Sequence, residues 1–154
     1  MNPIVVKFGG SSLATAGQFE KVTAIIRENP GRRYVVASAP GKRFSGDTKV
    51  TDLLYRCYDA ACAGQDFAPV LHEIRQRFAD IISELQLQVD LVPDFAAIEA
   101  HLRTSPQRDY MASRGEYLNS RLLAAYLGFS FVDAAQMVLF RADGSFDAEA
   151  TNTA

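Results

Sequence analysis

The sequence lacks the features that would place it in a membrane or in a secretory pathway. It has no run of about 18 consecutive apolar residues, so we expect no transmembrane helix. The N-terminal segment Met1-Asn2-Pro3-Ile4 carries no basic residues before the first apolar run, so we expect no signal peptide. The length of 154 residues fits one domain or part of a larger one.

An excess of charge of one sign is also missing. The chain has 16 basic and 18 acidic side chains, for a net charge of −2. A protein that binds nucleic acid or an anionic membrane surface would carry a clear basic excess, so we expect neither partner. Apolar residues make up 48% of the chain, which is enough for a hydrophobic core and argues against disorder.

Cysteine and histidine are scarce. Cys57 and Cys62 are too few for a disulfide framework, and no Cys/His set with zinc-finger spacing accompanies them. His72 and His101 have no partner at a metal or catalytic spacing. We therefore expect reduced thiols that pack as small apolar groups or lie free on a helix, a cytoplasmic location and no metal site.

The first third of the sequence predicts a βαβ unit. Residues 4–8 are mostly β-branched and apolar, as in a buried strand of a parallel sheet. Apolar residues at helical spacing predict a helix over 16–28, and residues 34–39 resemble the first strand in composition. A strand, a helix and a strand within so few residues indicate that the two strands are parallel.

The rest of the chain is predicted to be mainly helical. A polar loop is expected over 40–51, followed by helices over 51–63, 67–85, 93–103 and 109–127. The helices between 51 and 103 resemble an insertion beside the sheet. Gly128 is expected to end the last helix, and residues 129–132 to form a third strand. A β pair is expected from 138–142 with a turn at 143–144, and a small polar tail without a strand over 147–154.

A lysine and two glycines, Lys7-Phe8-Gly9-Gly10-Ser11-Ser12, end the first predicted strand just before a helix. Adjacent glycines let the backbone approach a ligand and leave N–H groups free for anionic oxygens. The downstream helix N-terminus favours phosphate, and Lys7 can add positive charge. The spacing fits neither a Walker A loop nor the dinucleotide glycine pattern. An ordinary Gly-Gly turn beside an exposed lysine remains the alternative.

Two further polar segments could carry chemistry. Ser38-Ala39-Pro40-Gly41-Lys42-Arg43 follows the second predicted strand, and open α/β sheets bind ligands at such carboxyl ends. Ser113-Arg114-Gly115-Glu116 lies early in a predicted helix, where a carboxylate can receive the amino group of a small substrate. The alternatives are a loop with solvated Lys42 and Arg43, and a glutamate placed favourably at a helix N-terminus.

Taken in order, three segments resemble the aspartate kinases of the amino-acid kinase family. The Lys7–Ser12 segment is similar to their opening signature. The second and third motifs are matched by Ser38-Ala39 with Val50-Thr51-Asp52-Leu53-Leu54, and by Ser113-Arg114-Gly115-Glu116 with Leu122-Leu123-Ala124. The resemblance covers about residues 4–133. It implies a three-layer α/β/α sandwich with a mainly parallel sheet, incomplete here and with a helical insertion.

The resemblance implies ATP-dependent phosphorylation of the β-carboxylate of L-aspartate, the first step towards lysine, threonine and methionine. ATP would arrive with Mg²⁺, and no tightly bound cofactor is implied. Lys7 would be the catalytic residue that stabilises the transferring phosphoryl group. The ATP phosphates would be bound by Lys7, Gly9, Gly10 and Ser11, and aspartate by Ser38, Thr51 and Glu116, with Glu116 facing its ammonium group.

The sequence departs from the family pattern after Asp133, where a glycine-rich nucleotide segment, adenine-binding loops and regulatory domains would follow. We therefore expect residues 1–154 to form the N-terminal, aspartate-side part of a kinase domain and to be inactive alone. An uncovered sheet edge and apolar face would promote self-association. A non-catalytic binding module that keeps this lobe, or another enzyme of the amino-acid-kinase fold, remains an alternative.

Overall fold

The computed structural model describes residues 2–153 and has an α/β architecture with two parallel strands. The chain runs through β1 (Ile4–Phe8), a 3-10 turn η1 (Gly10–Leu13), α1 (Ala16–Arg27) and β2 (Arg32–Ala37). Val6 pairs with Val35, and Phe8 pairs with Ala37. The predicted βαβ unit is confirmed, although β2 begins and ends two residues earlier than predicted.

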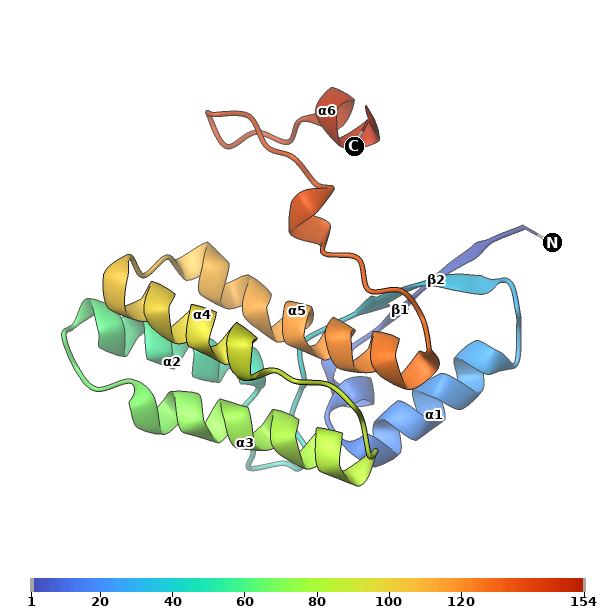
Figure 1. Cartoon of the computed structure of the whole chain (residues 1–154), viewed down its shortest axis with the longest axis horizontal. Helices are drawn as coiled ribbons and strands as arrows, with labels where there is room; N and C mark the ends of the chain where they lie inside the picture. The colour runs from blue at the N-terminus through green and yellow to red at the C-terminus, as the bar shows by residue number, and fades with distance from the viewer. Residues whose placement is uncertain (1, 154) are drawn as a thin grey trace.

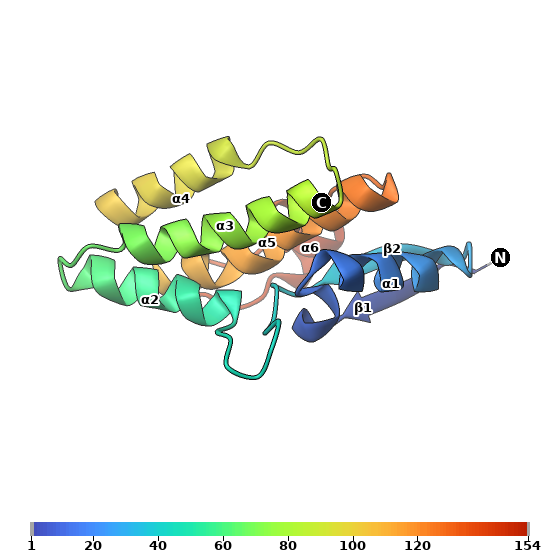
Figure 2. The same ribbon diagram turned by 90° about the horizontal axis from the view of Figure 1, so that it is seen from below.

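Four longer helices form a layer beside the strands (Figures 1 and 2). They are α2 (Val50–Cys62), α3 (Ala68–Glu84), α4 (Val92–Thr104) and α5 (Arg108–Leu127). Their bounds confirm the predicted helices, because their apolar residues recur at helical spacing and face one shared core. The stripe on α3 is buried at Leu71, Ile74, Phe78 and Ile81. Within the described residues, every helix is too short or too polar to span a bilayer.

The two faces of the sheet have different environments. The side chains of Val6, Phe8 and Val35 pack against the core that includes α1 and α5. On the opposite face, Val5 is 67% exposed and Tyr34 is 60% exposed. The prediction of a buried first strand is therefore wrong for residues 2–153, because helices cover only one face of this two-stranded sheet.

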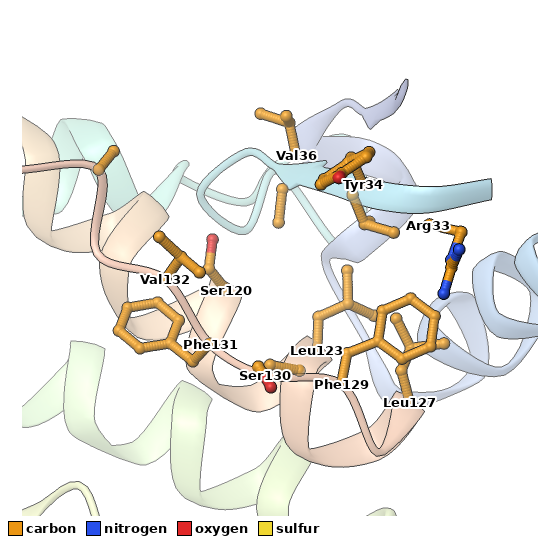
Figure 3. Close-up of a pocket in the computed structure, with 14 residues that line it drawn as sticks. Arg33, Tyr34, Val36, Ser120, Leu123, Leu127, Phe129, Ser130, Phe131 and Val132 are labelled. Atoms are coloured by element: carbon orange, nitrogen blue, oxygen red, sulfur yellow. The ribbon is translucent and has the colours of Figure 1, made fainter. Parts of the chain in front are cut away.

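The segment after α5 does not form the predicted third strand. Gly128 ends α5 with φ +73°, a left-handed conformation that glycine adopts without steric cost. Residues 129–132 then run beside β2, but a pocket of about 320 Å³ separates the two segments (Figure 3). A strand needs a hydrogen-bonding neighbour, so the apolar and β-branched residues here are not sufficient by themselves.

The last residues differ from the predicted β pair and tail. The pair is reduced to one antiparallel bridge between Phe140 and Phe146, around a turn with Gly144 at φ +83°. A second 3-10 turn, η2 (Ala134–Gln136), precedes it, and a short helix, α6 (Ala148–Thr153), follows it. The side chain of Asp147 accepts a hydrogen bond from the N–H of Ala150 at 3.0 Å, which starts α6 inside the polar tail.

Candidate functional site

The turns that follow β1 and β2 touch through two glycines. The N–H of Gly41 donates a hydrogen bond to the carbonyl of Gly10 at 2.9 Å. A Cβ on Gly41 would lie 2.7 Å from the carbonyl carbon of Gly10, and one on Gly10 would lie 2.7 Å from the carbonyl oxygen of Ala39. Side chains at these two positions would force the turns apart, so the close approach explains both glycines.

Helix α5 approaches the same turns through a third glycine. A Cβ on Gly115 would lie 2.6 Å from the Cβ of Ala39. One turn further along, the fully buried Asn119 donates from Nδ2 to the carbonyl of Ser38 at 2.7 Å. These two contacts hold α5 against the end of β2, and they bring Glu116, the neighbour of Gly115, to the turns.

Replacing Gly115 by Ala is expected to lower the free energy of unfolding by about 1–3 kcal/mol, because the added methyl group overlaps Ala39. Urea denaturation of the 154-residue chain measures this loss. Gly17→Ala is the matched control, since Gly17 lies in α1 with open space around its Cα and should show no loss. Equal stability of the two variants would contradict the proposed close packing of α5.

We call the cavity between these elements the strand-end pocket. It has a volume of about 460 Å³ and opens beside η1, the turn after β2, the start of α2 and the middle of α5. Its lining residues are Gly10, Ser11, Ser38, Ala39, Pro40, Gly41, Lys42, Lys49, Thr51 and Glu116. The N–H of Val50 donates to the carbonyl of Pro40 at 3.1 Å, which fixes the start of α2 at the pocket wall.

A second pocket of about 710 Å³ adjoins the first. It lies among β2, α2, α5 and the segment after α5, and it shares Thr51 and Glu116 with the strand-end pocket. Lys7 pairs with Val36, which lines this second pocket. Because paired residues of adjacent strands project from the same face, the exposed Lys7 side chain projects with Val36 from the open face of the sheet, and Lys7 is not a lining residue of the second pocket.

Charges of both signs surround the strand-end pocket. Lys42 and Lys49 come from the loop that precedes α2, and the exposed Glu116 comes from α5. None of these three side chains forms an ion pair with residues 2–153. The first turn of α2, at Thr51, adds the positive end of a helix dipole. Such a pocket suits a small ligand that carries both an ammonium group and anionic oxygens.

Five of the seven predicted site residues lie together in the strand-end pocket, namely Gly10, Ser11, Ser38, Thr51 and Glu116. Lys7 and Gly9 are not among its lining residues. The Lys7 side chain projects from the open face of the sheet, as does its partner Val36, whereas Ser38 and Glu116 line the strand-end pocket.

Two expectations about the site need correction. Glu116 lies about two turns inside α5, which begins at Arg108, so an N-terminal helix dipole does not explain this glutamate. Helix α1 contributes no lining residue to the strand-end pocket, and the turn η1 lines it instead through Gly10 and Ser11. Among residues 2–153, no cluster of His, Cys, Asp or Glu is arranged to hold a metal ion.

The sequence motifs do not predict Lys49 as a pocket residue, and Lys42 was expected to be a solvated lysine of the loop. Both residues are exposed, yet both line the pocket. Their place between Ser38 and Thr51, two predicted site residues, was the available signal. A loop that starts and ends at one site keeps its neighbouring side chains near that site.

Comparison with known proteins gives relatives over nearly the whole chain. The model described as "Amino acid kinase family" matches residues 2–153. Aspartokinase 3 of Bacillus subtilis (strain 168) is 39% identical over 137 residues, which cover 84% of this chain and 30% of that protein. "Aspartokinase 3, chloroplastic" of Arabidopsis thaliana is 31% identical over 141 residues, covering 80% of this chain and 23% of that protein.

Solved structures share the fold. The crystal structure of Clostridium acetobutylicum aspartate kinase matches with a TM-score of 0.94 and 42% identity, over 99% of this chain and 35% of that one. E. coli aspartokinase III, solved with aspartate and ADP, matches with a TM-score of 0.73 at 20% identity, over 97% of this chain and 36% of that one. The chain thus spans about a third of the length of these proteins.

Proposed function

The chain belongs to the amino acid kinase family, and we propose that its residues serve the phosphorylation of L-aspartate by ATP. The observation that carries the proposal is the strand-end pocket. It brings the glycine turn after β1 next to Ser38, Thr51 and Glu116. Gly10 and Ser11, which are proposed for phosphate, thus lie around the same cavity as the three residues proposed for aspartate, as a reaction between the two ligands requires.

In the proposed reaction, an oxygen of the β-carboxylate attacks the γ-phosphorus of ATP. The bond from that phosphorus to the oxygen bridging the β-phosphate breaks, so that ADP leaves and 4-phospho-L-aspartate forms. Catalysis of this kind depends on positioning and on neutralising charge. Mg²⁺ would accompany ATP and would be held by its phosphates. The product would enter the biosynthesis of lysine, threonine and methionine, in the cytoplasm, where the free thiols of Cys57 and Cys62 would stay reduced.

Each site residue has a proposed part in this reaction. Glu116 binds the ammonium group of aspartate, while Ser38 and Thr51 bind its carboxylate oxygens. The backbone N–H groups at Gly9 and Gly10, with Ser11, hold phosphate oxygens. Lys7 places a positive charge on the transferring phosphoryl group. Lys42 and Lys49, which also line the pocket, add positive charge for the two anionic ligands.

We further propose that residues 1–154 are the aspartate-side part of a kinase domain, whose nucleotide-binding half and regulatory domains lie outside this segment. The proposal rests on the match to about a third of the Clostridium enzyme. If only the aspartate-side part of the active site is present, water reaches the bound ATP and screens its contacts with the protein. The segment by itself is therefore expected to be inactive.

A hybrid kinase tests the proposed function. In the hybrid, residues 1–154 replace the matching third of the Clostridium acetobutylicum enzyme. The assay follows ADP release with ATP and Mg²⁺, with L-aspartate or L-glutamate as the acceptor. We expect the hybrid to release ADP in a way that depends on aspartate. For the 154-residue chain alone, we expect ADP release no higher than in a blank without enzyme. A folded hybrid that binds aspartate without releasing ADP would instead support a non-catalytic binding module.

We also propose that the 154-residue chain self-associates through its open sheet face. Val5, Tyr34 and Val36 are exposed there, and the edges of β1 and β2 have no partner strand within residues 2–153. A second copy of the chain can bury both the apolar face and an edge.

Sedimentation velocity should therefore show a sedimentation coefficient that rises with protein concentration. Tyr34→Lys should reduce this rise, because it places a charge on the open face. Val92→Lys, at a residue of α4 that is 74% exposed, is the control and should leave the association unchanged. Equal effects of the two substitutions would argue against the sheet face as the interface.

A further inference from the structure

Helix α3 carries an arginine that is almost completely buried. Arg77 is 3% exposed, and a buried arginine is rare unless it is paired. Its guanidinium donates one hydrogen bond to the carbonyl of Gly41 at 2.6 Å and another to the carbonyl of Thr48. It also lies 3.4 Å from Oδ2 of Asp47. All three partners belong to the loop between β2 and α2.

Asp47 links Arg77 to a second arginine. The side chain of Asp47 is 5% exposed and accepts two hydrogen bonds from the guanidinium of Arg43, at 2.8 and 2.9 Å, and one from its backbone N–H at 2.9 Å. These hydrogen bonds, with the charge of Arg77, hold the pKa of Asp47 well below its usual range. The carboxylate is therefore ionised and can neutralise the buried guanidinium.

The contacts of Arg77 close the loop at both ends. Gly41 begins the segment and Thr48 ends it, so one side chain fixes the distance between their carbonyls. Lys42 and Lys49, which line the strand-end pocket, are the next residues after these two anchors. Arg77 itself does not line the pocket.

We propose that Arg77 is a positioning residue, which acts through the loop of residues 41–48 to hold Lys42 and Lys49 at the strand-end pocket and so sets the affinity for aspartate. The role in aspartate affinity rests on the proposed function, whereas the order of the loop does not. The planar guanidinium group of arginine has several N–H donors, so it can hydrogen-bond to two carbonyls while it faces a carboxylate. The single ammonium group of lysine cannot keep all three contacts in place.

A purely structural role for Arg77 makes a different prediction, because loss of a core contact would weaken the whole fold. Arg75 provides the matched control. It lies on the same helix, bonds Glu99 on α4 at 2.9 Å and stacks on Phe95 at 5.4 Å, and among residues 2–153 it forms no hydrogen bond or ion pair with the loop. Arg75→Lys thus makes the same substitution at a more exposed ion pair on the other side of α3.

The experiment measures amide hydrogen exchange in the 154-residue chain, with Arg77→Lys, Asp47→Asn and Arg75→Lys compared with the parent chain. For Arg77→Lys, exchange at residues 42–49 should be about tenfold to a hundredfold faster, while the core amides of α2 and α5 stay protected. Asp47→Asn should change the same segment, which provides a second test if Arg77→Lys does not fold. Arg75→Lys should leave the loop unchanged.

The hybrid kinase supplies the second readout. Arg77→Lys should raise the KM for aspartate with little change in kcat, and Arg75→Lys should change neither. The proposal is overturned if the loop amides keep their protection in both Arg77→Lys and Asp47→Asn, or if exchange rises equally in loop and core. If loop exchange rises in Arg77→Lys but the parent hybrid has no aspartate-dependent activity, the proposed function is wrong. The proposal that Arg77 holds the loop of residues 41–48 in place is then still supported.

Discussion

Replacing Lys7 by Ala is expected to lower the kcat of the hybrid kinase about a hundredfold or more, with little change in the Kd of aspartate. The side chain lies on the open face of β1 and is exposed, so its removal leaves no cavity in the core. Its proposed role is to offset the negative charge on the phosphoryl group during transfer. An interaction of this kind is strongest in the transition state and affects turnover more than binding.

The measurement combines steady-state ADP release with aspartate titration of the same preparations. Lys21→Ala is the control, because Lys21 is an exposed lysine of α1 that lines neither pocket. Near-normal turnover of the Lys7→Ala hybrid would contradict the proposed catalytic role of Lys7. An equal loss for both substitutions would indicate a general effect of surface charge.

Replacing Glu116 by Gln is expected to raise the KM for aspartate about tenfold to a hundredfold and to leave the KM for ATP nearly unchanged. Glutamine has almost the same shape as glutamate but has no negative charge, so the change removes the counter-charge for the ammonium group of the substrate. A hydrogen bond between charged groups contributes about 1.5–3 kcal/mol, which sets this range. Because Glu116 is exposed, the free energy of unfolding should not fall.

Glu20→Gln on α1 is the control for the Glu116 substitution, since Glu20 is an exposed glutamate outside the pocket. The two Michaelis constants are measured with the other substrate at saturation. Equal increases for aspartate and ATP would contradict the assignment of Glu116 to the ammonium group. No change in either constant would place the ammonium site elsewhere.

The helices were predictable because their signal is local. The apolar residues of α3 recur every three or four positions. This pattern predicts a helix with one buried face, and the prediction does not depend on which helix packs against that face. Residues 129–132 show the limit of that approach. They have the composition of a strand, yet strand formation depends on a neighbouring backbone, and a pocket lies between them and β2.

The position of the pocket was also predictable, because parallel strands bring their carboxyl ends to one edge of a sheet. Gly10 and Ser38 therefore lie at one pocket although many residues separate them. The place of Lys7 depended on which face of β1 becomes covered, and the alternation of the strand alone did not show it. Arg77 lies three residues after Ile74, on the buried side of α3, but its partners are in a loop far away in the sequence.

The central claim is that the strand-end pocket binds aspartate. The most direct test is a titration of the isotope-labelled 154-residue chain with L-aspartate and, separately, with ATP, followed by NMR of the backbone amides. We expect aspartate to shift the amides of Gly10, Ser38, Thr51 and Glu116, and to leave the α3–α4 side of the molecule unchanged. The Glu116→Gln chain should show these shifts only at about tenfold to hundredfold higher aspartate concentration. Absence of aspartate-dependent shifts at the pocket, or an unchanged concentration dependence in Glu116→Gln, would contradict aspartate binding at this pocket.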